Sequence, residues 1–169
     1  MDDIFDVNYE EDTQHGRYLT FTLEENTYGI PIRFVTEIIG IQPATKIPET
    51  PDFIKGIINL RGRIVPLIDV RLKFGKEEIT YNERTCIIVV DVNGMQVGFI
   101  VDKVEDVLTI DDEDIAVPPK SELGFENRYI DGIGKVDNSV VLLLNAEKLL
   151  KNEEIDLMAN IVSSEENSL

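Results

Sequence analysis

Few side chains in this sequence could carry out acid–base or covalent chemistry. His15 is the only histidine, and it lies in an acidic N-terminal segment that we expect to be disordered. Cys86 is the only cysteine and falls in the apolar run TCIIVV, where a small buried hydrophobic residue is expected. A histidine-activated nucleophile and a zinc site both need further partners inside the fold. The sequence therefore disfavours both kinds of site.

Carboxylates are numerous, but their spacing does not match a known site. Asp111–Asp114 lacks the alternating ligands and the central glycine of a calcium loop, so a solvated acidic loop is the preferred interpretation. Gly132-x-Gly134 lacks the strand–loop–helix pattern of a phosphate site. A carboxylate-dependent enzyme stays open as an alternative. We expect a binding function, without a metal or another cofactor.

A pair of arginines raises a different question. The segment Asn59–Arg63 reads NLRGR and interrupts an apolar stretch from Gly56 to Val70. Asparagine and glycine between apolar runs predict a hairpin turn. A turn does not explain why Arg61 and Arg63 are both basic in so acidic a chain.

The charge distribution favours a protein partner over nucleic acid. The net charge is −17, with 33 acidic and 16 basic residues, whereas nucleic acids and anionic membranes attract clustered lysine and arginine. Between Arg33 and Lys76, however, eight basic residues accompany only four acidic ones. This segment is either a docking surface for an acidic partner or ordinary solvated surface.

Short apolar runs predict a mainly β protein. The runs are four to six residues long, rich in valine and isoleucine, and bounded by turn-forming residues. Many short strands of this kind are typical of barrels and sandwiches. The predicted strands are Tyr18–Leu23, Ile57–Leu60, Ile64–Ile68, Ile87–Val92, Val97–Val101 and Val140–Leu144.

The chain also contains an internal repeat. Residues 18–41 align with residues 87–110 at an offset of 69, and residues 53–73 align with residues 129–149 at an offset of 76. Such self-similarity predicts two like units, at about 18–76 and 84–150, with exchange of strands between them left open. Units this small bury little surface alone, so we expect them to pack together and form a groove.

Capping residues predict short helices after each unit. Asp69 can cap residues 70–74, and Asn145 can cap residues 146–151. In the C-terminal segment 151–169, Asn152 can cap a third helix before an acidic tail; its apolar stripe would cover the core or, alternatively, a partner's groove.

No signal peptide and no membrane span are expected. Residues 1–16 are acidic and lack the basic start and apolar segment of a signal peptide. No run of 18 apolar residues is present. We expect a cytoplasmic protein without direct membrane insertion.

Several blocks between about Tyr18 and Leu150 resemble the CheW family of chemotaxis coupling proteins. They are FTLEENTYGI, KIPETPDFIKGIINLRG, IVPLIDVRLKFG, VGFIVDKVEDVL and LLNAEKLL, in that order. The resemblance implies two five-stranded β-barrels packed about a shared hydrophobic zone, and no enzymatic activity. Since the chain has no room for kinase, phosphotransfer or receiver domains, it resembles a stand-alone coupler, and we expect a monomer in isolation.

The resemblance also implies partners. The cytoplasmic tip of a methyl-accepting chemotaxis receptor would bind at the groove between the barrels, and the regulatory domain of the histidine kinase CheA would bind by barrel-to-barrel contact. The protein would then be recruited to membrane receptor arrays. A coupler for another histidine-kinase pathway, such as pilus motility, is the alternative.

Two sets of binding residues follow from the resemblance. The aliphatic members could equally be core residues. The receptor-binding set is Ile32, Val35, Arg61, Ile64 and Val101. The kinase-binding set is Glu37, Ile38, Gly40, Pro43 and Thr45.

The repeat predicts a role for Arg61. At the two offsets, Glu37 corresponds to Asp106 and Arg61 to Asp137, so an opposite-charge pair in one unit becomes two acids in the other. We hypothesise that Arg61 reaches Glu37 and holds the turn that carries Ile32 in a receptor-competent position. A solvated turn residue and a direct receptor contact are the alternatives.

Overall fold

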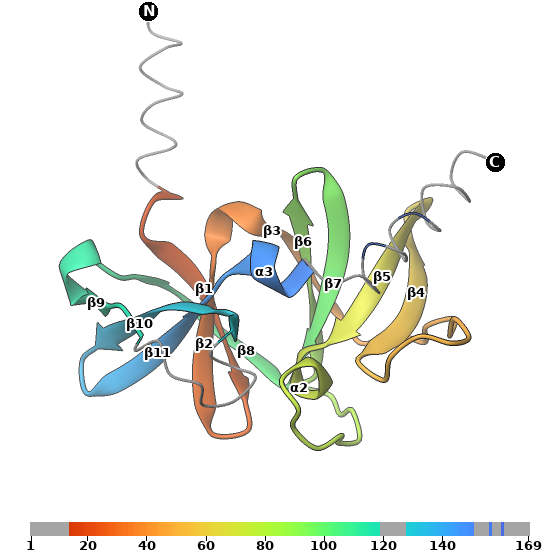
Figure 1. The fold of residues 1–169 in the computed structure, drawn as a ribbon, viewed down its shortest axis with the longest axis horizontal. Coiled ribbons are helices and arrows are strands. Elements are labelled where there is room, and N and C mark those ends of the chain that lie inside the picture. The colour runs from red at the N-terminus through yellow and green to blue at the C-terminus, as the bar shows by residue number, and fades with distance from the viewer. Residues whose placement is uncertain (1–13, 119–127, 151–155, 157–159, 161–169) are drawn as a thin grey trace, which may run out of the picture.

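Two β-sheets lie side by side in the computed structural model, which describes residues 14–118, 128–150, 156 and 160 (Figure 1). Sheet A has the order β8 (Lys103–Thr109), β1 (Arg17–Leu23), β2 (Asn26–Pro31), β11 (Ser139–Leu144), β10 (Ile130–Val136) and β9 (Ile115–Ala116). Sheet B has the order β3 (Val35–Gly40), β6 (Cys86–Val92), β7 (Met95–Val101), β5 (Arg63–Asp69) and β4 (Ile54–Leu60). The short helices are η1 (Ile32–Phe34), α2 (Val70–Lys73), η2 (Asp112–Asp114) and α3 (Ala146–Leu150). The prediction of a mainly β protein with few short helices is confirmed.

The two halves of the chain interlock. The β1–β2 hairpin joins β8–β11 in sheet A, whereas the β6–β7 hairpin joins β3–β5 in sheet B. Repeated strands take equivalent places: Leu67 pairs with Gly98 in the parallel β5–β7 ladder, and Leu143 pairs with Gly29 in the parallel β11–β2 ladder. The chain therefore crosses between sheets twice, through η1 after β2 and through a single residue after β7.

Close packing at these parallel ladders requires glycine at the two equivalent positions, Gly29 and Gly98. A Cβ on Gly98 would lie 2.6 Å from Cδ2 of Leu67 and 2.7 Å from Cγ2 of Ile87. A Cβ on Gly29 would lie 3.1 Å from Cδ2 of Leu143. Since any side chain would push the neighbouring strand away, glycine recurs at this point of the repeat.

The sheets bend back on themselves without a closing ladder in the described residues. After β3, Thr45 exchanges two backbone hydrogen bonds of 2.9 Å with Ile57 on the opposite edge strand of sheet B. In sheet A, Ala116 of β9 similarly pairs with Ile133 of β10. In each sheet, the chain that leaves one edge strand thus returns to the other edge. The two edge strands of a sheet do not pair with each other in the described residues, so both sheets are open.

Three apolar clusters fill this architecture. One lies within sheet B and includes Leu67, Ile87 and Val89, and a smaller one lies within sheet A around Val141 and Leu143. The largest cluster takes residues from both sheets and from α2 and α3, which lie where the sheets meet (Figure 1). Strands such as β6 face two clusters and are buried on both sides, which explains their continuous apolar sequence.

Both predicted caps within the described residues are confirmed. The Asp69 carboxylate accepts a hydrogen bond from Leu72 N at 3.2 Å, and the Asn145 side chain accepts one from Lys148 N at 2.9 Å. Capping satisfies backbone donors that a helix start leaves unpaired. The cap predicted at Asn152, its helix and most of the N-terminal segment lie outside the described residues. Within the described part of the chain, no helix is both long and apolar enough to cross a membrane.

Candidate functional site

The NLRGR segment forms the tight turn between β4 and β5. Leu60 pairs with Arg63, and the two turn residues Arg61 and Gly62 have φ angles of 53° and 87°. Two successive positive φ values are typical of a type I′ hairpin turn. Asn59 Oδ1 accepts a hydrogen bond from Gly62 N at 2.8 Å, which fixes the turn. The predicted turn is confirmed, and it holds Arg61 in a left-handed conformation that arginine rarely adopts.

Arg61 forms an ion pair with Glu37 of β3, as hypothesised from the repeat. The Arg61 side chain is 72% exposed and that of Glu37 is 26% exposed. The hydrogen bond to Glu37, and then the Glu37 charge, raises the pKa of the Arg61 guanidinium. Because β3 and the β4–β5 hairpin lie at opposite edges of sheet B, this pair joins the two edges beside the Thr45–Ile57 bridge.

The structure brings most of the receptor-binding candidates to one end of sheet B and its crossing to sheet A. Ile32 lies in η1 and Val35 begins β3, and both are partly buried against the shared core. Arg61 is exposed in its turn, and Ile64 is partly buried on β5. Their binding roles stay predictions.

Val101 is the receptor-binding candidate that the structure buries, in agreement with the alternative that it is a core residue. Its side chain is only 1% exposed and belongs to the shared core. It ends β7, where both neighbouring faces are covered, so it supports the surface from below and cannot present its side chain to a partner.

The kinase-binding candidates occupy β3 and the segment after it. On β3 exposure alternates, so Ile38 faces outward at 44% exposure while Ile39 packs into sheet B. Glu37 is partly buried, whereas Gly40, Pro43 and Thr45 are exposed. An exposed isoleucine on a sheet edge is available for contact with another protein.

A hollow of about 390 Å³ lies beside this segment and was missed from the sequence. Pro43 is the predicted site residue that lines it. The other lining residues are Ile41, Gln42, Ala44, Lys55, Leu67, Tyr81 and Ile100. Tyr81 follows an acidic, irregular segment, so no periodic pattern indicated that it packs here.

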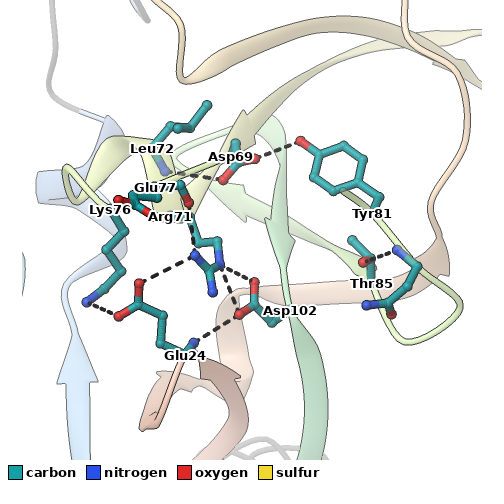
Figure 2. Close-up of polar contacts among 10 residues, drawn as sticks. Glu24, Asp69, Arg71, Leu72, Lys76, Glu77, Tyr81, Thr85 and Asp102 are labelled. Atoms are coloured by element: carbon teal, nitrogen blue, oxygen red, sulfur yellow. Dashed lines mark hydrogen bonds and ion pairs between the residues drawn. The ribbon is translucent and has the colours of Figure 1, made fainter. Parts of the chain in front are cut away.

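Tyr81 is held by Asp69, the buried residue that caps α2. Its hydroxyl donates a hydrogen bond to Asp69 Oδ2 at 2.7 Å (Figure 2). Burial, followed by this hydrogen bond, raises the pKa of the Tyr81 hydroxyl above its ordinary value of 10.0. Lys55 pairs with Glu78 in the same loop. The loop between α2 and β6 is thus fastened to the wall of the hollow.

The candidate catalytic groups do not come together. Cys86 is half-buried rather than fully buried, and its Sγ contacts the carbonyl oxygen of Arg84 at 3.3 Å. His15 Nε2 lies 3.4 Å from Asp112 Oδ2, and both side chains are exposed. In the part of the chain that the structure describes, no group of three or more histidine, cysteine or acidic residues could hold a metal ion.

Comparisons with known proteins agree on one family. The model of the CheW-like domain matches residues 17–154. The chemotaxis protein CheW of Klebsiella aerogenes is 41% identical over 153 residues, covering 90% of this chain and 92% of that protein. The chemotaxis protein CheW of Helicobacter pylori is 34% identical over 144 residues, covering 85% and 87%.

A solved structure supports the same assignment. The scaffolding protein TtCheW from Thermoanaerobacter tengcongensis has a TM-score of 0.76 and 36% identity, covering 82% of this chain and 94% of that chain. With the interlocked sheets, this similarity extends to both sequence and fold. The chain belongs to the CheW-like family and is a non-catalytic chemotaxis adaptor.

Proposed function

We propose that this adaptor binds the cytoplasmic tip of a chemoreceptor and the regulatory domain of the histidine kinase CheA at the same time. The observation that carries the proposal is the Arg61–Glu37 ion pair. It connects the turn next to the receptor-binding candidates with the strand that carries the kinase-binding candidates. A change on one side can therefore reach the other through one contact.

The kinase would bind along β3 and the segment to Thr45. Support comes from Ile38, an exposed apolar side chain on an edge strand, and from the apolar hollow at Pro43. Apolar anchors beside a hollow commonly contribute much of the affinity of a protein interface. Contact with a similarly built domain would proceed edge to edge, as the family resemblance implies.

The receptor would bind near the first crossing between the sheets. Ile32 and Val35 lie there, next to the shared core, and Arg61 and Ile64 lie on the adjoining hairpin. A helical receptor tip needs an apolar strip with a few charges, which these residues supply. Binding would recruit this protein to receptor arrays at the membrane.

We further propose that each sheet, with its returning segment, acts as one small barrel within a single domain over residues 17–150. The Thr45–Ile57 and Ala116–Ile133 contacts support this, since each joins the segment after one edge to the opposite edge. The protein would be a monomer in isolation and would assemble only with its partners.

A binding experiment with purified components tests the proposal. The full chain is mixed with a kinase regulatory domain, with a receptor signalling fragment, and with both. We expect binding to each and a ternary complex when both are present. If a correctly folded sample bound neither partner, the proposal that this protein binds a chemoreceptor and CheA would be refuted.

A further inference from the structure

Asp102 stands at the second crossing between the sheets. It is the single residue between β7 of sheet B and β8 of sheet A. The backbone conformation of Asp102 therefore affects the orientation of one sheet relative to the other. Whatever holds Asp102 also limits how the two sheets can move relative to each other.

Arg71 of α2 contacts both carboxylate oxygens of Asp102 (Figure 2). Arg71 Nε donates hydrogen bonds to Asp102 Oδ1 at 2.8 Å and Oδ2 at 3.0 Å, and Nη1 donates to the carbonyl oxygen of Glu77 at 2.9 Å. The Arg71 side chain is only 10% exposed. Charge-assisted hydrogen bonds from a planar guanidinium restrict orientation more strongly than a single contact does.

The β1–β2 turn of sheet A joins the same cluster. Glu24 has a φ of 56°, and its backbone N donates a hydrogen bond to Asp102 Oδ2 at 2.9 Å. Its carboxylate lies 3.4 Å from Arg71 Nη1 and 3.4 Å from Lys76 Nζ (Figure 2). Arg71 and Asp102 thus connect the helix after β5, the crossing and a turn of the other sheet.

Stability alone is a poor explanation for this cluster. Largely buried ion pairs lose hydration, and replacement of both partners by apolar residues of similar volume is often neutral or stabilising. The hydrogen bond to Asp102, which outweighs burial, raises the pKa of Arg71, so the guanidinium stays charged. The Arg71–Asp102 contact therefore contributes chiefly by fixing the orientation of the residues that it joins.

Among the described residues, the first crossing has no equivalent of the Arg71–Asp102 contact. At the repeat offsets, Arg33 of η1 corresponds to Asp102, and Glu147 of α3 corresponds to Arg71. No ion pair joins Arg33 to Glu147 in the described residues; the Arg33 guanidinium instead lies 4.8 Å from the centre of the Phe34 ring. In the part of the chain that the structure describes, an ion pair therefore holds the second crossing, and the first crossing, which carries Ile32, lacks the corresponding pair.

We propose that Arg71 and Asp102 are positioning residues for receptor binding, because their clamp sets how the two sheets face each other. This inference rests on the proposed function, in which the receptor binds near the first crossing between the sheets. The kinase candidates lie on β3 and its following segment, within sheet B alone. Loss of the clamp should therefore separate the two binding activities.

The test compares Arg71→Met with Lys148→Met. The control removes the exposed ion pair between Lys148 Nζ and Asp131 Oδ1, which lie 3.4 Å apart and, among the described residues, make no contact with Arg71 or Asp102. We expect Arg71→Met to weaken binding of the receptor signalling fragment about tenfold or more, with kinase affinity changing less than about twofold. The control should leave both affinities unchanged. Equal loss of both affinities, or no loss of receptor affinity, would overturn the inference.

A distance measurement tests the clamp without any partner. Spin labels are placed at Asn93, in the β6–β7 turn, and at Asn138, in the β10–β11 turn, in a Cys86→Ser background. Arg71→Met should broaden the distance distribution between the two sheets, and Lys148→Met should not. An unchanged distribution in Arg71→Met would contradict the clamp even if the unmodified protein bound neither partner.

A milder variant covers the case in which Arg71→Met fails to fold. Arg71→Lys keeps the positive charge but cannot donate to Asp102 and to the Glu77 carbonyl at once in the fixed plane of a guanidinium. We expect it to fold and to show the same separation of receptor and kinase binding, by a smaller factor. A folded Arg71→Lys protein with unchanged receptor affinity and an unchanged label distance would refute the positioning role.

Discussion

Arg61 in the β4–β5 turn pairs with Glu37 on β3, so an ion pair with an exposed arginine joins the opposite edges of one sheet. The other copy of the repeat has Asp137 and Asp106 at these positions and cannot form the pair. The turn is thus common to both copies, and the ion pair is a feature of one. Exposed pairs contribute little to stability, which favours a role in binding.

A double-mutant cycle tests that role. Glu37→Ala and Arg61→Ala should each weaken receptor and kinase binding, and the double variant should bind no more weakly than the weaker single variant. Titration calorimetry with each partner measures the coupling. Arg63→Ala, a nearby exposed arginine on the same hairpin, provides the control for loss of charge. Full additivity would rule out a functional pair.

Arg61→Asn separates the turn from the ion pair. Asparagine tolerates the positive φ of this position but cannot reach Glu37 as arginine does. We therefore expect an unchanged denaturation midpoint together with the binding defect of Arg61→Ala. Wild-type binding by this variant would assign the effect of Arg61→Ala to the turn alone.

Gly98→Ala should destabilise the protein. The added methyl group would meet Leu67 and Ile87 at a parallel ladder, and overpacking of this kind typically costs about 1–3 kcal/mol. Urea denaturation followed by circular dichroism measures the change. For Gly40→Ala the new Cβ would have no neighbour within 4 Å, so its midpoint should match the wild type. Equal midpoints for both variants would contradict the packing argument.

Tyr81→Phe should lower stability in a pH-dependent way. Loss of the hydroxyl removes a hydrogen bond to the buried Asp69, at a cost of about 1–3 kcal/mol. Folding raises the pKa of Tyr81 above 10.0, so its contribution is complete below that pH and declines as pH rises further. The stability difference between wild type and variant should therefore be constant below pH 10 and shrink above it.

Urea denaturation at several pH values between 7 and 11 measures this difference. Tyr129→Phe is the matched control, since it removes the hydroxyl of another partly buried tyrosine, whose ring stacks on Phe74. A difference that stays constant or grows above pH 10 would contradict the assignment to Tyr81.

Ile38→Lys should weaken kinase binding without affecting folding. Ile38 projects from an edge strand and is 44% exposed, so a lysine can extend into solvent in the free protein. Burial of that charge in an interface would lower the affinity for the kinase regulatory domain about tenfold or more. Val140→Lys, at an exposed position on β11 of the other sheet, should retain kinase binding. Unimpaired binding by Ile38→Lys would exclude β3 as the kinase surface.

Local patterns predicted much of the fold. All six strands expected from apolar runs lie within observed strands, and Asp69 and Asn145 cap their helices. These features depend on residues a few positions apart, where spacing is informative. The Arg61–Glu37 contact joins residues 24 positions apart, and it was predicted only because the repeat offered a second copy for comparison.

Other features had no local signal. The edge strand β3 alternates between partly buried and exposed residues, and in the edge strand β8 only Val104 and Leu108 are partly buried, so the exposed positions weakened the apolar pattern. Val101 reads equally well as core or surface within an apolar run, and burial by a second sheet decides between them. Arg71 and Asp102 are 31 positions apart, so only the tertiary fold reveals their contact.

The two crossings also impose an order on synthesis and folding. Sheet B is built from one continuous segment, residues 35–101, whereas sheet A needs residues 17–31 from before it and residues 103–144 from after it. A nascent chain can therefore complete sheet B while the first hairpin to leave the ribosome still lacks its neighbours. The β1–β2 hairpin is made first but gains its neighbours β8 and β11 only at the end, so premature release of the chain would expose this apolar hairpin.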